Sequence, residues 1–363
     1  MKIVCEKNDF LAGISTTQKA LSSRTTIPSL EGVMIEAVRE NIVFTATDLI
    51  LTIESTIQAD VVLDGRVLLP GRLLSEIIRK MPDGQIELEK VDNNVVISAE
   101  NTHTTIASMN IDEYPSLPVV EETNMIKVPQ NILKDLIEKT SFAVATDESR
   151  PILTGCLVEV SDNVMRTVAL DGYRLAVSEV PFETGVNISV VVPGHAMSET
   201  AKILTYDDAE IAVSFHDKYV LFDLVHTKII VRLLEGEFIK YKTIIPQDFA
   251  TEVIVSRKLM EDGVERAALI AKENKTSIIV VSISNNKMVI TSRAENGNAH
   301  EEINVSMMGK DIEIGFNSRY ITDSLKAVND EFVKISLKTN LSPCVITSNK
   351  DDRYLYLILP VRM

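Results

Sequence analysis

The residue types that carry catalysis are present in this 363-residue chain, but they form no local catalytic pattern. There is no Gly-rich phosphate loop, HExxH pair, GxSxG turn or CxxC pair. The histidines are scattered, and none has a partner at metal-ligand spacing: His103, His195, His216, His226 and His300. The pairs Asp207-Asp208 and Asp351-Asp352 lie among turn-forming residues, which is typical of solvated loops. We therefore expect no enzyme activity, cofactor or metal, although a carboxylate pair assembled from distant segments leaves no local signature and stays open.

Two other segments could recognise a partner. Residues 167–177 read Thr-Val-Ala-Leu-Asp-Gly-Tyr-Arg-Leu-Ala-Val, which places an Asp-Gly turn, Tyr173 and Arg174 between two strand-like runs. The chain ends in Tyr-Leu-Tyr-Leu-Ile-Leu-Pro-Val-Arg-Met. An end that stays apolar is usually docked rather than frayed. We interpret 354–359 as a core strand and 360–363 as the rim of an apolar groove.

Composition limits the class of protein. The net charge is −15 and the pI is about 4.9, so a basic field over the whole surface is excluded. The cysteines are few, odd in number and far apart, which argues against disulfides and zinc ribbons: Cys5, Cys156 and Cys344. No segment reads as a signal peptide or a membrane span. We expect a cytoplasmic protein with no membrane contact.

The chain repeats itself with a step of about 123 residues. Val67-Leu-Leu-Pro-Gly-Arg-Leu-Leu-Ser-Glu recurs as Val190-Val-Val-Pro-Gly-His-Ala-Met-Ser-Glu, and a more diverged copy begins at Asn317. Each copy has two apolar residues at helical spacing followed by a base: Leu74, Ile78 and Arg79; Met197, Ala201 and Lys202; Ile321, Leu325 and Lys326. The repeat predicts three domains, at 1–122, 125–246 and 247–363.

Short alternating runs rich in Val, Ile and Thr predict antiparallel strands between these helices. The clearest are 41–47, 86–90, 95–99, 164–169, 211–215, 278–282, 288–292 and 354–359. Each third of the chain then holds two helices and about eight strands. The predicted fold class is α+β, with three repeated domains, each of two helices packed on antiparallel sheets.

Positive charge is concentrated in the predicted helices, at 8–21, 71–81, 130–142, 194–205, 256–271 and 318–329. Together they carry a net charge of +3, so the rest of the chain carries −18. Charge alone favours a plain interpretation, in which Lys and Arg occupy solvent-facing helix positions. The repeated base at Arg79, Lys202 and Lys326 suits a cationic surface that attracts phosphates without reading bases.

Taken together, the chain resembles the bacterial DNA polymerase III beta subunit, the sliding-clamp family, over its full length. The motifs that carry the resemblance, in order, are Met1-Lys-Ile, Arg24-Thr-Thr-Ile-Pro28, Ala46-Thr-Asp-Leu49, Asp112-Glu-Tyr-Pro115, Leu170-Asp-Gly-Tyr-Arg-Leu-Ala176, Glu235-Gly-Glu-Phe238 and Ile314-Gly-Phe-Asn317. The resemblance implies a DNA clamp fold and a head-to-tail homodimer, a six-domain ring with helices around the hole. It implies a non-catalytic processivity factor of the DNA polymerase III holoenzyme that encircles double-stranded DNA topologically and slides without sequence preference. The implied partners are the replicative polymerase alpha subunit, the clamp loader and other clamp-motif proteins of repair and replication.

The resemblance also implies site residues. The partner-peptide pocket would use Leu153, Gly172, Tyr173, Arg174, Leu175, Ile239, Thr243, Ile244, Cys344, Leu357, Ile358, Leu359, Pro360, Val361, Arg362 and Met363. Arg24 would contact DNA, and the repeat adds Lys19, Arg79, Lys202 and Lys326. The dimer seam would use Thr104, Ile106, Leu269 and Ile270. Two rival hypotheses stay open: an enzyme with a dispersed site, and an acidic repeated scaffold that binds proteins but not DNA.

Overall fold

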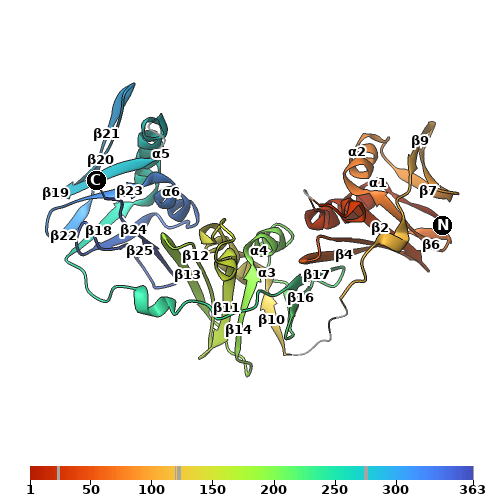
Figure 1. Ribbon diagram of the computed structural model, residues 1–363, viewed down its shortest axis with the longest axis horizontal. Coiled ribbons are helices and arrows are strands. Elements are labelled where there is room, and N and C mark those ends of the chain that lie inside the picture. The colour runs from red at the N-terminus through yellow and green to blue at the C-terminus, as the bar shows by residue number, and fades with distance from the viewer. Residues whose placement is uncertain (23–24, 119, 121–123, 274–276, 363) are drawn as a thin grey trace. The chain divides into compact units, whose positions relative to one another are not determined.

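The computed structural model describes residues 1–22, 25–118, 120, 124–273 and 277–362 (Figure 1). The chain divides into two compact units by its internal contacts. Unit 1 consists of Met1–Asn131 and Glu199–Leu233, and unit 2 of Ile132–Ser198 and Leu234–Met363.

Each predicted helix is present among the described residues. The six α-helices are α1 (Lys7–Thr17), α2 (Gly71–Lys80), α3 (Gln130–Glu138), α4 (Gly194–Ala201), α5 (Arg257–Glu273) and α6 (Ser318–Lys326). The predicted ends at residues 21, 142, 205 and 329 were wrong, because α1, α3, α4 and α6 end at Thr17, Glu138, Ala201 and Lys326. After α3, the Thr140 hydroxyl bonds back to the Leu136 carbonyl, and the chain continues into the 3-10 turn η4 (Ser141–Ala143). After α4, the amide of Thr205 donates to the side chain of Gln130 instead of to the helix.

The repeated helix positions behave as their residue types predict. The apolar pairs of α2, α4 and α6 are all buried: Leu74 and Ile78, Met197 and Ala201, Ile321 and Leu325. The bases that follow them, Arg79, Lys202 and Lys326, are all exposed. The apolar faces anchor each helix on its sheet, where burial of one such side chain stabilises the fold by about 1.5–3 kcal/mol.

In the part of the chain that the structure describes, the 26 strands pair antiparallel and form four sheets. Unit 1 contains β1 (Lys2–Glu6), β2 (Gly32–Val38), β3 (Asn41–Thr47), β4 (Leu51–Gln58), β5 (Asp60–Leu63), β6 (Gly65–Pro70), β7 (Gln85–Val91), β8 (Asn94–Ala99), β9 (Thr102–Ala107), β10 (Met125–Pro129), β15 (Glu210–Phe215), β16 (Tyr219–Asp223) and β17 (Thr227–Arg232). Unit 2 contains β11 (Gly155–Ser161), β12 (Val164–Leu170), β13 (Arg174–Pro181), β14 (Ile188–Pro193), β18 (Thr251–Ser256), β19 (Ile278–Ser284), β20 (Lys287–Ala294), β21 (Gly297–Asn304), β22 (Ser306–Gly309), β23 (Ile312–Asn317), β24 (Phe332–Leu337), β25 (Cys344–Ser348) and β26 (Tyr354–Ile358). The eight predicted strands are all present, and the last ends at Ile358 rather than at Leu359.

Strands from different thirds of the chain share sheets. The sheets of unit 1 have the orders β5-β1-β7-β8-β9 and β10-β15-β16-β17-β4-β3-β2-β6, and those of unit 2 have the orders β14-β11-β12-β13-β26-β25-β24-β18-β22 and β21-β20-β19-β23. The pair β17–β4 joins the first and second thirds, and the pair β13–β26 joins the second and third. The α+β class with three repeated pairs of helices on antiparallel sheets is confirmed.

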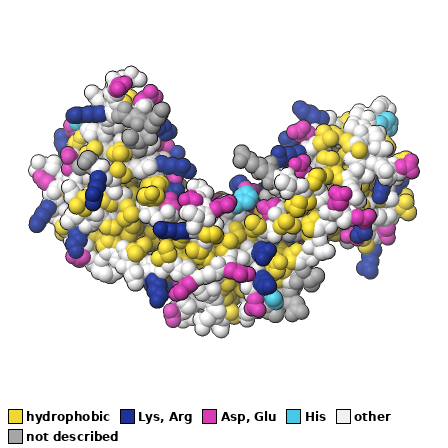
Figure 2. Space-filling view, in the orientation of Figure 1, with side chains coloured by type: hydrophobic (Ala, Val, Ile, Leu, Met, Phe, Trp, Pro, Cys, Tyr) yellow, Lys and Arg dark blue, Asp and Glu magenta, His cyan; other side chains and the backbone are white. Residues whose placement is uncertain are grey.

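Helices pack side by side over the sheets within each unit, as α1 and α2 do in unit 1 and α5 and α6 in unit 2 (Figure 1). In unit 1, Phe10 of α1 meets Phe44 of β3 edge to face at 4.9 Å between ring centroids. None of the described helices is both long and apolar enough to span a bilayer. Figure 2 shows basic and acidic side chains interspersed on the visible face, not gathered in one basic field.

Candidate functional site

The turn from β12 to β13 is built around Asp171. Its Oδ1 accepts hydrogen bonds from the backbone amides of Tyr173, at 2.9 Å, and Arg174, at 3.1 Å. Gly172 between them has φ +93°, a backbone conformation that residues with a Cβ rarely adopt. The carboxylate and the glycine therefore hold Tyr173 at the tip of the turn, where it is 62% exposed.

Arg174 is buried, and its side chain makes three hydrogen bonds inside unit 2. Its guanidinium donates to Asp171 Oδ2 at 3.1 Å, to Asp323 Oδ2 at 2.6 Å and to the Phe142 carbonyl at 2.6 Å. The Tyr320 ring lies beside it, with 4.6 Å between the guanidinium carbon and the ring centroid. Arg174 therefore joins the turn to α6 and to η4, and each of its three guanidinium nitrogens donates one of these hydrogen bonds.

Below the turn lies an apolar cluster on one face of the nine-stranded sheet. The register pairs Leu175 with Leu357 and Val177 with Leu355, and side chains alternate along a strand, so these four share a face. The buried members of this cluster are Leu153, Leu157, Val168, Leu170, Leu175, Val177, Val191, Tyr241, Val345 and Leu357. The predicted pocket residues Leu153, Leu175 and Leu357 therefore meet, as its buried floor.

Partly buried apolar side chains pack against this floor, among them Phe238 and Ile245. Their chain neighbours Ile239 and Ile244 are exposed, and so is Leu359, two residues after Leu357; all three are 37–43% exposed. The 3-10 turn η6 (Tyr241–Ile244) ends with Ile244 and places Tyr241 in the cluster. A cavity of about 250 Å³ adjoins the cluster and is lined in part by Val177, Tyr241, Ile245 and Leu355. We call this surface, from Tyr173 to η6 and the C-terminal segment, the groove.

The C-terminal segment is docked, as the sequence predicts. The amide of Leu359 donates to the Tyr173 carbonyl at 2.9 Å, and that of Val361 donates to the Gly315 carbonyl at 2.8 Å. Pro360 and Val361 are half-buried, and Arg362 is exposed. Met363 lies outside the described residues.

Three predicted pocket residues face away from the groove. Cys344 and Arg174 both pair with Ile358 across β26, so these three share the opposite face of the sheet. Arg174 contacts α6 there, and Cys344 and Ile358 are fully buried. The structure therefore gives them a supporting position, not a groove surface. Thr243 is exposed on η6, with its hydroxyl bonded to the Lys240 carbonyl.

Sequence reasoning missed Tyr320, which stacks on Tyr173 with ring centroids 6.3 Å apart. Tyr320 lies on α6, 147 residues from Tyr173 in the chain. Its only sequence signal is its place three residues after Asn317, at the start of the third helix repeat.

Some of the Lys and Arg side chains predicted to contact DNA form ion pairs within the chain, and others do not. Lys202 Nζ lies 2.6 Å from Glu199 Oε1, and Lys326 Nζ lies 2.6 Å from Glu265 Oε1. Lys19 donates to the Ser15 carbonyl, and burial lowers the pKa of its amine, while Glu199 opposes and Lys202 adds to that shift. Arg79 is exposed and makes no ion pair with any residue that the structure describes. Arg24 lies outside the described residues.

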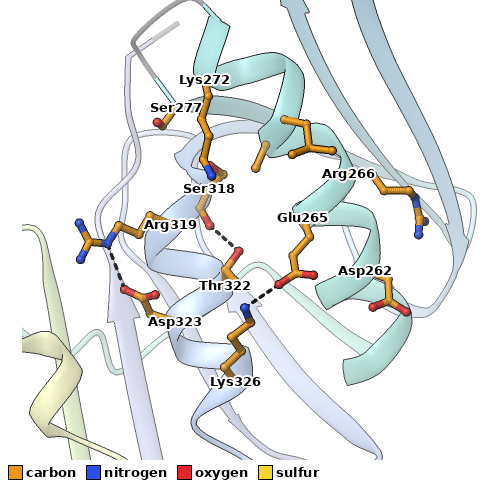
Figure 3. Close-up of a pocket in the computed structure, with 12 residues that line it drawn as sticks. Asp262, Glu265, Arg266, Lys272, Ser277, Ser318, Arg319, Thr322, Asp323 and Lys326 are labelled. Atoms are coloured by element: carbon orange, nitrogen blue, oxygen red, sulfur yellow. Dashed lines mark hydrogen bonds and ion pairs between the residues drawn. The ribbon is translucent and has the colours of Figure 1, made fainter. Parts of the chain in front are cut away.

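A cavity of about 850 Å³ lies between α5 and α6 (Figure 3). Lys326 of α6 reaches across to Glu265 of α5, and Arg319 turns back to Asp323 at 3.6 Å. Its wall includes Leu269, a predicted seam residue that is 65% exposed. The charges in this cavity are thus largely neutralised within the chain.

The other predicted seam residues differ in exposure. Ile106 of β9 is 6% exposed, while Thr104 of β9 and Ile270 of α5 are half-buried. Thr104 and Ile106 belong to unit 1, and Leu269 and Ile270 to unit 2. Leu269 is the most exposed of the four predicted seam residues.

Within the described ranges, no group of three or more His, Cys, Asp or Glu side chains could hold a metal ion. Asp207 and Asp351 each accept a backbone hydrogen bond from two residues on, as in turns. Burial raises the pKa of all three thiols to about 12, so Cys5, Cys156 and Cys344 have little nucleophilic thiolate.

Three family models match the chain in order. They are the N-terminal domain of the DNA polymerase III beta subunit over residues 1–118, its central domain over 127–240 and its C-terminal domain over 242–362. The beta sliding clamp of Halalkalibacterium halodurans is 32% identical over 378 residues, which covers 100% of both chains. That of Staphylococcus epidermidis is 31% identical over 374 residues, covering 100% of this chain and 99% of the relative.

Solved structures of sliding clamps are also similar to this chain. The DNA polymerase sliding clamp of Bacillus subtilis superposes with a TM-score of 0.94 at 32% identity, covering 100% of this chain and 99% of its own. The DNA polymerase III beta subunit of Thermotoga maritima gives 0.93 at 29% identity, with the same coverage. From the repeated helices to the docked C-terminus, the chain belongs to the DNA polymerase III beta subunit family of bacterial sliding clamps.

Proposed function

We propose that this chain is a DNA polymerase processivity factor that works as a head-to-tail homodimeric ring around duplex DNA. The in-order, full-length match to the three beta-subunit domains carries the proposal. Each third, at 1–122, 125–246 and 247–363, contributes one domain, so two chains supply six. The exposed Leu269 on α5 and the β9 strand of unit 1 contribute to the two seams.

A closed ring holds DNA topologically, so its contacts need to be neither tight nor sequence-specific. Phosphate contacts orient a protein on the duplex without reading the bases. Each neutralised phosphate steepens the salt dependence of binding and slows movement along the helix. A chain with net charge −15 and mostly paired helix bases suits a ring that slides.

The groove is the docking site for short peptide segments of partners. Its buried floor and its half-exposed rim of Ile244, Ile239 and Leu359 would accept two or three apolar anchors. Two or three anchors contribute roughly 3–9 kcal/mol in all, and the ordering cost of the peptide offsets part of this, so we expect an affinity no tighter than micromolar, which corresponds to about 8 kcal/mol. Partners can then exchange on one ring: the replicative polymerase alpha subunit, the clamp loader, and clamp-motif proteins of repair and replication.

The chain acts in the cytoplasm as a non-catalytic subunit of the DNA polymerase III holoenzyme. Its contribution is a tether: a polymerase bound in the groove stays beside the template between cycles of nucleotide addition. This role requires no catalytic residue, metal or cofactor of its own.

Primer extension on long primed DNA tests this function. Adding the chain together with a clamp loader and ATP should lengthen the products made in one polymerase encounter. The chain alone should turn over no substrate and should not lengthen products without the loader. If the products stay short with the loader present, the proposed function is wrong.

A further inference from the structure

The six helices differ sharply in how their basic side chains are partnered. The helix α2 carries Arg72, Arg79, Lys80 and one acid, Glu76, which gives it the largest positive charge of the six. All three bases are exposed, and none makes an ion pair with a residue that the structure describes. Free guanidinium and ammonium groups of this kind are available to phosphate oxygens.

The helices α5 and α6 show the opposite arrangement. On α5, Arg257 lies 2.6 Å from Glu261, Lys258 lies 2.7 Å from Asp262, and Arg266 bonds to Glu301 at 2.7 Å. On α6, Arg319 and Lys326 are paired with Asp323 and Glu265 (Figure 3). Among the described basic residues of α5 and α6, only Lys272, in the last turn of α5, makes no ion pair.

The basic residues at the equivalent position of the three repeats also differ in whether a carboxylate pairs with them. Arg79, Lys202 and Lys326 follow the same buried pair on α2, α4 and α6. Lys202, just after α4, is neutralised by Glu199 in the last turn of α4, and Lys326 is neutralised by Glu265 on the neighbouring helix. Two carboxylates from different helix positions thus neutralise the repeated base in two repeats. Arg79, the base at the same position of the first repeat, has no such carboxylate among the described residues.

We propose that α2 is the main phosphate contact of each chain and that Glu199 and Glu265 hold Lys202 and Lys326 out of DNA binding. The inference rests on the proposed function, in which these helices face the duplex. A paired lysine must give up or share its carboxylate before it takes a phosphate, and the carboxylate repels that phosphate. Contact is therefore concentrated on α2, and the other repeats pass over DNA with little drag.

Substitutions that each remove one charge test the proposal on the full-length chain. Binding to a labelled linear duplex is measured by fluorescence anisotropy from 50 to 200 mM salt. Arg79→Gln should flatten the log–log salt slope by about 0.9 for each phosphate that is no longer neutralised, which is roughly a 3.5-fold smaller affinity change over this range. Lys326→Gln should leave the slope unchanged, and Glu265→Gln should steepen it because Lys326 is released.

The pair Lys287–Glu302 supplies the matched control. It joins β20 to β21 at 3.0 Å, with side-chain exposures of 56% and 51%, against 55% and 44% for Lys326 and Glu265. Glu302→Gln makes the same change in net charge as Glu265→Gln and should not change the slope. Glu199→Gln, which frees Lys202, repeats the test on a second helix if Glu265→Gln fails to fold.

Two results would overturn the proposal: Lys326→Gln flattening the slope as much as Arg79→Gln does, or Glu265→Gln and Glu302→Gln giving the same slope. Retention of the wild-type chain on nicked circular DNA separates the causes. If the wild-type ring is retained but the salt slopes of the variants differ from those expected, only the proposal that phosphate contact is concentrated on α2 is wrong. If the wild-type chain is not retained, the proposed function and this inference fall together.

Discussion

The Arg174 guanidinium donates a 2.6 Å hydrogen bond to the Asp323 carboxylate, 149 residues further along the chain. The bond joins the first residue of β13 to α6, while the next residue, Leu175, faces the groove. Because Arg174 also bonds to Asp171 and to the Phe142 carbonyl, this side chain ties the groove turn to both α6 and η4.

Arg174→Ala should lower the free energy of unfolding by about 3 kcal/mol, since it removes one donor from each of two carboxylates and from the Phe142 carbonyl. Arg174→Lys should recover only part of this loss, because an ammonium group cannot reproduce the planar fork. Urea unfolding followed by circular dichroism measures both. Unchanged stability together with lost peptide binding would mean instead that Arg174 contacts the partner directly.

Truncation of a groove rim residue should weaken partner binding without weakening the fold. Ile244→Ala and Leu359→Ala should each reduce affinity for a polymerase-derived clamp-motif peptide by about tenfold, equivalent to roughly 1.4 kcal/mol. Calorimetric titration measures the affinity, and Met308→Ala, at an exposed position on β22, is the control. Equal affinity for Ile244→Ala and wild type would move the peptide site away from η6.

The seam prediction concerns Leu269, which is 65% exposed on α5. Leu269→Asp should shift the homodimer to monomer, because a carboxylate would be buried against an apolar partner surface. Leu259, 55% exposed on the same helix but turned to another side, provides the control Leu259→Asp. Sedimentation equilibrium measures both, and a dimeric Leu269→Asp would exclude this residue from the seam.

The three thiols predict a pH dependence of stability. Burial raises their pKa from an ordinary 9.0 to about 12, so the folded chain holds these protons more tightly than the unfolded chain does. Their contribution is fully present below pH 9 and is lost between pH 9 and 12, by up to about 1.4 kcal/mol per thiol and pH unit.

Alkylation tests the burial of these three thiols, which is the cause of their raised pKa. At pH 8 iodoacetamide should label none of Cys5, Cys156 and Cys344 in the folded chain and all three after unfolding. Rapid labelling of Cys344 in the folded chain would show that the sheet beside the groove opens.

The sequence sufficed for elements with local periodicity. The buried pairs of α2, α4 and α6, and the alternating strands such as β3 and β12, follow from residue spacing alone. The Asp171 turn and the docked C-terminus were also readable, because an Asp-Gly pair and an apolar chain end have few other uses.

What the sequence could not supply was pairing between distant segments. The partners of Arg174, the stacking of Tyr320 on Tyr173 and the ion pair of Lys326 with Glu265 each depend on sheet register or helix packing across many residues. The register also places Cys344 and Ile358 on the face opposite Leu357, a one-residue distinction that family resemblance alone does not make.

Topological retention tests the central claim most directly. The chain is loaded by a clamp loader onto nicked circular plasmid, the complex is separated from free protein at moderate salt, and half of it is linearised with a single-cut nuclease. We expect a dimer of about twice 40.3 kDa that stays on the circle and leaves the linear DNA within minutes. Equal retention on both forms, or a monomer that never stays on the circle, would contradict the ring.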